Sequence, residues 1–378
     1  MTGRDQALDG LRGIAILLVL ACHLLQFQPT SLLTTWLNLL SKSLWIGVDL
    51  FFVLSGFLIT GILIRTRQDA HRVRNFYVRR TLRIFPAYYL MVLATLGVVW
   101  AFHTSPRIVE DTLGFFPLLL VFGQNIVSAI SPERPMLREL TPLWSLAVEE
   151  QFYLFWPWLV WRCSPQNLPK LCLALLATAL VSKFGMVLTG VQAPAIYHLT
   201  LSRMDTLAVG ALLASWHATG RALPRWLWSL PVLAGLGLVA LFIGCRGLRM
   251  SEGALVIALA TAATPLLCGG ILQASLDGAG ALRRALCARV LVFFGTYSYG
   301  LYLVHFIADA GVKLALTPQL SPHWQGNRLM LLLAAISVML SVLMALLLHR
   351  LVEAPALRLK ARFAADAPAP LNAAKTLS

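Results

Sequence analysis

Charged residues are scarce in this sequence. Only 12% of the 378 residues are charged, whereas soluble domains average about 25%. The six cysteines are scattered, with no Cys-x-x-Cys pair and no His/Cys spacing typical of zinc, so we expect no metal site. The sequence also contains no internal repeat and no low-complexity tract. These absences argue against a soluble domain, a zinc module and a repeat protein.

Hydrophobic stretches take the place of the missing charge. Hydrophobic residues make up 58% of the chain, and apolar runs long enough to cross a bilayer, about 18 residues or more, recur from end to end. Because a helix satisfies its own backbone hydrogen bonds in lipid, the pattern predicts an all-α, polytopic transmembrane bundle. We expect about ten spans, at 8–26, 44–64, 84–102, 143–162, 170–189, 200–217, 227–244, 253–273, 290–312 and 329–351.

The net charge of +15 lies mostly between the predicted spans, and this placement argues against a nucleic-acid partner. The segment from Arg65 to Arg83 alone holds seven arginines, and the positive-inside rule puts this side and both termini in the cytoplasm. We expect one membrane domain at 1–362 and a disordered cytoplasmic tail at 363–378. The apolar stretch 113–127, in the longest outer loop, is expected to be either re-entrant or interfacial.

Several ionisable side chains fall inside predicted spans, where lipid disfavours them. A helical rise of about 1.5 Å per residue puts six of them at a similar depth in the outer half of the bilayer: His23, Asp49, Glu149, Arg203, Asp205 and His305. Two interpretations remain open: one polar pocket, or separate groups that reach toward the interface at helix ends. The short Asp and Glu side chains favour the pocket.

A second charged group lies near the predicted cytoplasmic face. Arg80 and Arg83 run directly into a span and share a helix face, which suits bidentate phosphate binding. Membrane orientation by itself explains the other arginines of this loop, Arg79 included. Arg12 lies at the same face, roughly 16 Å along its helix from His23. This equipment fits acyl transfer from a phosphate-bearing donor inside to a hydroxyl outside, with histidine as the base. A transporter is the alternative, although the broken helices and repeats typical of transporters are not found.

Seven sequence blocks occur in the order expected for one known family. The chain resembles the acyltransferase type 3 family, bacterial membrane O-acyltransferases that modify lipopolysaccharide, capsule and other sugars. The blocks are Leu8–His23 (an Arg-x10-His pattern), Gly47–Phe57, Arg80–Pro86, Trp144–Tyr153, Arg203–Asp205, Tyr297–His305 and Val352–Pro355. Together they cover nearly the whole chain.

The resemblance implies a multi-pass enzyme of the bacterial inner membrane. Its co-substrate would be cytoplasmic acyl-CoA, usually acetyl-CoA, with no tightly bound cofactor, and its acceptor a sugar hydroxyl of the cell envelope. Carried over by position, the catalytic residues are His23 and Glu149, and those serving the donor are Arg12, Arg80 and Arg83. Residues expected to contact substrate or support the site are Asp49, Arg203, Asp205, Tyr302 and His305.

Two further expectations follow from the family. Some relatives append an outer hydrolase-like domain; here we expect that domain to be absent or supplied by a separate periplasmic partner. Direct transfer and transfer through an acyl-enzyme both fit the sequence.

Overall fold

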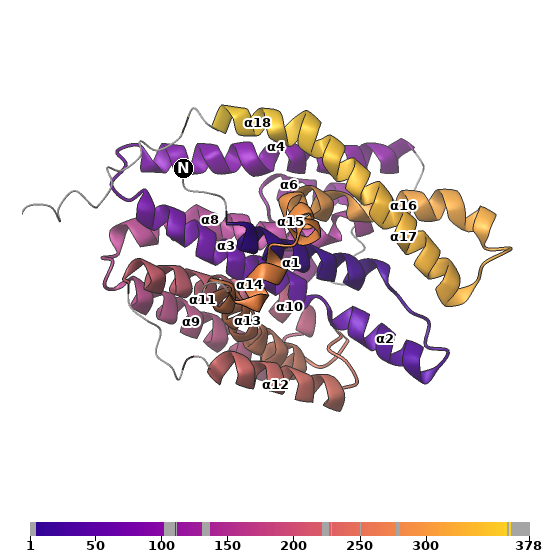
Figure 1. Cartoon of the computed structure of the whole chain (residues 1–378), viewed down its shortest axis with the longest axis horizontal. Coiled ribbons are helices and arrows are strands. Elements are labelled where there is room, and N and C mark those ends of the chain that lie inside the picture. The colour runs from indigo at the N-terminus through magenta and orange to yellow at the C-terminus, as the bar shows by residue number, and fades with distance from the viewer. Residues whose placement is uncertain are drawn as a thin grey trace, which may run out of the picture.

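The computed structural model describes residues 5–101, 110, 112–130, 137–220, 227, 229–249, 251–276, 280–360 and 363. Every regular element in these ranges is a helix (Figure 1), so the predicted all-α class is confirmed for this part of the chain. The predicted tail at 363–378 lies outside the described residues, except for Phe363.

Each predicted span overlaps a helix. These helices are α1 (Gln6–Leu24), α3 (Ile46–Arg65), α4 (Arg72–Ala101), α8 (Trp144–Arg162), α9 (Leu168–Leu188), α11 (Thr200–Ala218), α12 (Ser229–Gly244), α13 (Ala254–Leu276), α16 (Ser298–Leu320) and α17 (Gly326–Leu348). Within the described residues, six segments are long and apolar enough to cross a membrane: Gln6–Leu24, Leu32–Arg65, Leu168–Leu188, Ala254–Leu276, Ser298–Leu320 and Gly326–Leu359. The molecule is therefore a helical multi-pass membrane protein, while ten spans and cytoplasmic termini stay predictions.

The helices differ from the expected spans in three places. An additional helix, α2 (Leu32–Ser43), precedes α3, and the predicted span 290–312 divides into α15 (Arg289–Thr296) and α16. Gly295 and Thr296, both weak helix formers, lie at this division. Helix α4 begins at Arg72, well before the predicted span. Arginine is a good helix former, so the arginines ahead of the apolar stretch extend the helix instead of forming a loop.

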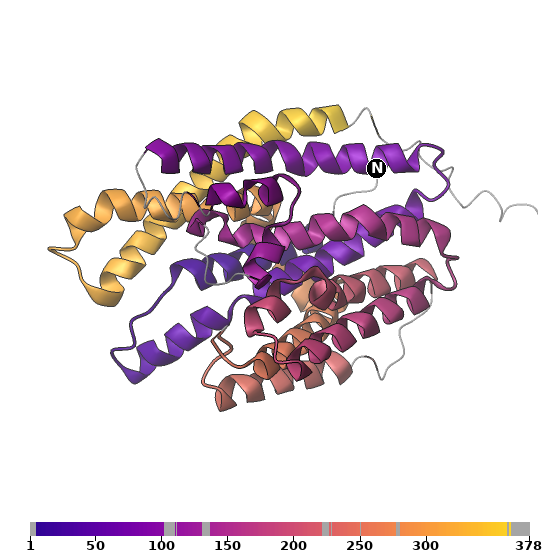
Figure 2. The ribbon, with the colours of Figure 1, turned by 180° about the vertical axis from the view of Figure 1, so that it is seen from behind.

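Helix α1 lies in the middle of the bundle, with α4 and α18 (Ala354–Lys360) along one edge and α12 along the other (Figures 1 and 2). Glycines allow the closest helix contacts. A Cβ atom on Gly13 would lie 2.0 Å from the carbonyl oxygen of Leu291, and one on Gly210 would lie 2.0 Å from that of Val53. Only glycine fits such approaches, so these positions hold α1 against α15 and α3 against α11.

The apolar stretch 113–127 includes the short helix α6 (Phe116–Leu120) and the first residues of a second one, α7 (Gln124–Ile130). The hydroxyl of Tyr88 in α4 donates to the carbonyl of Leu119 at 2.7 Å. The side-chain amide of Gln124 donates to the carbonyl of Leu143 at 2.7 Å, at the end of the short 3₁₀ helix η1 (Arg138–Leu143). The stretch thus packs on α4 and on the start of α8, while its re-entrant or interfacial placement stays a prediction. Much of its loop, at 102–109 and 131–136, lies outside the described residues.

Candidate active site

Two of the predicted site residues, His23 of α1 and His305 of α16, touch each other. Nδ1 of His23 lies 3.0 Å from Nε2 of His305, and the rings stack with centroids 5.1 Å apart. Phe306 packs against both rings, with centroids 4.7 Å away in each case. His305 is fully buried, whereas His23 remains partly exposed. His23 is therefore the more accessible member of the pair.

Three of the expected polar residues and one unexpected lysine form two buried ion pairs. Arg203 donates to Asp49, and Nζ of Lys183 donates to Asp205 at 2.5 Å. All four of these side chains are fully buried. The pairs join α11 to α3 and to α9. Removing one partner of such a buried pair is strongly destabilising, so we interpret both pairs as structural. Lys183 was not predicted, although a lone lysine inside an apolar segment could have indicated a buried pair.

Glu149 lies with the arginines, not with His23. The hydroxyl of Tyr153 donates to its carboxylate at 2.9 Å, and the charges of Arg80 and Arg12 act on it. No hydrogen bond joins Glu149 to His23 in the part of the chain that the structure describes. The six residues predicted at one depth thus do not share one pocket. Helix rise estimates depth but not the direction in which a side chain leaves its helix.

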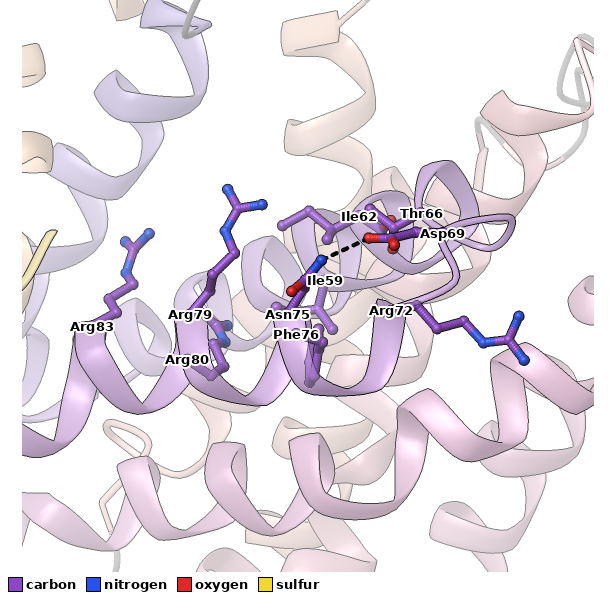
Figure 3. A pocket seen from close by; sticks show the side chains of 10 residues that line it. All are labelled: Ile59, Ile62, Thr66, Asp69, Arg72, Asn75, Phe76, Arg79, Arg80 and Arg83. Atoms are coloured by element: carbon purple, nitrogen blue, oxygen red, sulfur yellow. Dashed lines mark hydrogen bonds between the residues drawn. The ribbon is translucent and has the colours of Figure 1, made fainter. Parts of the chain in front are cut away.

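The arginines of α4 line an open pocket at the start of that helix (Figure 3). Arg79, Arg80 and Arg83 all border it, and the side chains of Arg79 and Arg83 extend from the same side of α4 (Figure 3). The guanidinium of Arg80 also lies over the ring of Tyr153, 4.1 Å from its centroid. Arg79, assigned to membrane orientation from the sequence, thus shares this cavity with Arg80 and Arg83. Its spacing of four residues from Arg83 could have placed both on one helix face.

A second cavity is lined by Tyr302, whose ring centroid lies 5.9 Å from that of His305. Arg12 and Glu149 border it as well, and Tyr302 precedes His305 by less than one turn of α16. The Tyr302 hydroxyl donates to the carbonyl of Pro142 at 2.6 Å and accepts from Ser145 at 2.6 Å. Of the predicted site residues, Arg12, Glu149 and Tyr302 thus share one cavity.

A charged cluster beyond the histidines was not predicted. Asp309, one turn after His305, is buried and accepts hydrogen bonds from Lys313 at 2.7 Å and Ser337 at 3.2 Å. Arg138 of η1 lies 3.6 Å from Asp309 and 5.1 Å from the centroid of the Phe306 ring. Arg138 lies outside the predicted spans, so its charge did not mark it as a residue inside the membrane.

Fold and site together define a multi-pass membrane protein with a cluster of arginines at one cavity, a second cavity between Arg12 and Tyr302, and a histidine pair inside the bundle. A family model described as an acyltransferase domain, that of the acyltransferase type 3 family, matches residues 5–349. The chain belongs to this acyltransferase family.

Several curated proteins are similar to the chain. Peptidoglycan O-acetyltransferase OatA of Listeria monocytogenes is 29% identical over 326 residues, covering 79% of this chain and 48% of OatA. The putative peptidoglycan O-acetyltransferase YrhL of Bacillus subtilis is 37% identical over 161 residues, 40% of this chain and 23% of YrhL. A putative O-acetyltransferase of Staphylococcus aureus is 26% identical over 382 residues, 92% of this chain and 56% of the relative.

The chain spans about half the length of the relatives that it matches most extensively. No solved structure is significantly similar to it.

Proposed function

We propose that this chain is an O-acyltransferase of the bacterial plasma membrane. It moves an acyl group, acetyl in the first instance, from cytoplasmic acyl-CoA to a hydroxyl of a cell-envelope sugar. The observation that carries this proposal is the cavity that Arg12, Glu149 and Tyr302 border, with the Tyr302 ring 5.9 Å from the ring of His305. The names of the relatives make peptidoglycan a first acceptor to test.

The arginine end of the site would hold the donor. Guanidinium groups match phosphate oxygens in fork geometry, and Arg80 and Arg83 line one cavity with Arg79. Arg12 borders the second cavity, which would take the arm that carries the thioester. The rise from Arg12 to His23, roughly 16 Å, resembles the reach of a phosphopantetheine arm. Glu149, predicted to be catalytic, borders this same path.

His23 would act at the far end as the general base. It takes the proton of the acceptor hydroxyl while that oxygen attacks the thioester carbonyl. The carbon–sulfur bond then breaks, and the proton held on His23 passes to the departing thiolate. A neutral histidine suits the first step and its protonated form suits the second.

Labelling in proteoliposomes tests the assignment. Purified protein, radiolabelled acetyl-CoA on the arginine side and a peptidoglycan fragment on the other side should yield labelled acceptor. His23→Ala should lower this rate by about 10²–10⁴-fold, the usual contribution of a general base. His323→Gln, which alters an exposed histidine after α16, is the matched control and should leave the rate unchanged.

The donor site has its own test. Arg83→Gln should raise KM for acetyl-CoA, whereas Arg162→Gln, at an exposed arginine at the end of α8, should not.

Full activity of His23→Ala would refute the role of the base. Movement of an acyl group or a sugar across the membrane without acyl-CoA-dependent labelling would favour a transporter.

A further inference from the structure

The second nitrogen of His305 decides how the histidine pair is protonated. Nδ1 of His305 lies 2.8 Å from the carbonyl oxygen of Tyr302 and 3.2 Å from that of Leu301. A carbonyl oxygen can only accept a hydrogen bond, so Nδ1 of His305 carries the proton. In the neutral ring, Nε2 then has no proton and presents a lone pair.

That lone pair faces His23. Nε2 of His305 lies 3.0 Å from Nδ1 of His23, so Nδ1 of His23 must be the donor. A neutral His23 with its proton on Nδ1 has an unprotonated Nε2. Among the described residues no hydrogen bond reaches this Nε2, and His23 is the partly exposed ring of the pair.

The opposite arrangement would require a positively charged His305. That ring is fully buried, and an unpaired buried charge is costly. The nearest carboxylate along α16, Asp309, already contacts Lys313 at 2.7 Å and Arg138 at 3.6 Å. The charged groups around the pair thus give His305 no carboxylate of its own, and the neutral arrangement follows.

We propose that His305 is a positioning residue that selects the tautomer of His23 and so makes Nε2 of His23 the proton acceptor. This inference rests on the proposed function for its catalytic meaning, but not for its geometry. The acceptor hydroxyl gives its proton to Nε2 as its oxygen bonds to the thioester carbon. The resulting imidazolium keeps its Nδ1–H bond to His305. When the carbon–sulfur bond breaks, the Nε2 proton leaves with the thiolate, which restores the starting tautomer.

Nitrogen NMR of the full chain tests the tautomer directly. The protein is labelled with ring-¹⁵N histidine in nanodiscs, and the signals of His23 are identified by their loss in His23→Gln. At neutral pH, His23 should show a protonated Nδ1 and an unprotonated Nε2. The same pattern should persist in His305→Gln, whose amide oxygen can accept from Nδ1, and should be lost in His305→Leu.

Activity supplies the second readout. His305→Gln should retain kcat within about tenfold of the unaltered protein, since one hydrogen bond of similar direction is kept. His305→Leu should lower kcat by as much as about 10⁴-fold, the loss seen when a catalytic histidine adopts the wrong tautomer, with KM for acyl-CoA unchanged. If His305 had a purely structural role, the loss of kcat in each variant would instead follow the drop in its unfolding temperature.

The outcomes separate the two proposals. A proton on Nε2 of His23 in the unaltered protein, or an unchanged tautomer in His305→Leu, overturns the positioning role whatever the activity. Equal kcat for His305→Gln and His305→Leu, with both variants folded, overturns it as well. Absence of acyl transfer together with the expected tautomers would overturn the proposed function only.

Discussion

Replacing Asp49 with asparagine should be among the most damaging single substitutions in the bundle. Asp49 and Arg203 are both fully buried, and the guanidinium of Arg203 lies between the rings of Phe52 and Tyr197, 5.6 and 5.1 Å from their centroids. Two of the guanidinium nitrogens, Nε and Nη1, already have no hydrogen-bond partner in the described part of the chain. Without the carboxylate, the cation would keep its burial and lose its counter-ion.

The expected loss follows from this geometry. Removing one member of a buried pair costs about 3–5 kcal/mol, whereas replacing both by apolar groups of similar size is neutral or stabilising by about 1–4 kcal/mol. Asp49→Asn should therefore destabilise strongly, and the double variant Asp49→Leu with Arg203→Met should recover. The half-exposed pair Arg249–Glu252, 3.2 Å apart, is the matched control, because ion pairs in contact with solvent contribute only about 0–1 kcal/mol.

Thermal unfolding in nanodiscs, followed by tryptophan fluorescence, measures these differences, and acetyl-CoA labelling measures activity in the same preparations. We expect the double variant to regain both stability and activity, because the pair joins α3 to α11 and does not contact the histidines. An unchanged unfolding temperature for Asp49→Asn would refute the reasoning. A stable but inactive double variant would show instead that the pair contacts a substrate.

Two other predictions concern helix packing and the loop before α4. Gly210→Val should reduce the yield of folded protein in fluorescence-detected size exclusion, because the new Cβ atom would lie 2.0 Å from the Val53 carbonyl oxygen, whereas Gly237→Val meets nothing within 4 Å; equal yields would contradict the close-packing argument. The backbone N–H of His71 holds the pKa of Asp69 below its usual value, so the stability from Asp69 is present above about pH 4 and is lost as the pH falls through the lowered pKa. Asp69→Asn should therefore flatten the acid side of the curve of unfolding temperature against pH, and an unaltered curve would contradict this.

Hydropathy predicted the helical class because lipid gives the backbone no other hydrogen-bond partners. A helix overlaps every predicted span. Hydropathy did not predict that α4 begins at Arg72 or that α15 and α16 are separate helices. Those boundaries depend on helix propensity and on packing against α1, which an apolar average does not report.

The family membership was also readable from the sequence, since the order of seven blocks is a property of the chain alone and the family match covers residues 5–349. The partners of the polar residues were not readable. His23 and His305 are 282 positions apart, and Asp205 pairs with Lys183 and not with Arg203. Glu149, predicted at the depth of His23, lies with Arg12.

The sequence by itself determined that the chain is a membrane-embedded helical protein of the acyltransferase type 3 family, because composition, hydropathy and motif order need no third dimension. The tertiary structure decided which polar side chains meet. Helix rise reports how deep a residue lies, but the contact it makes depends on the rotation of its helix and on the neighbour packed beside it. The hydrogen bond between His23 and His305 exists only because α1 and α16 lie side by side.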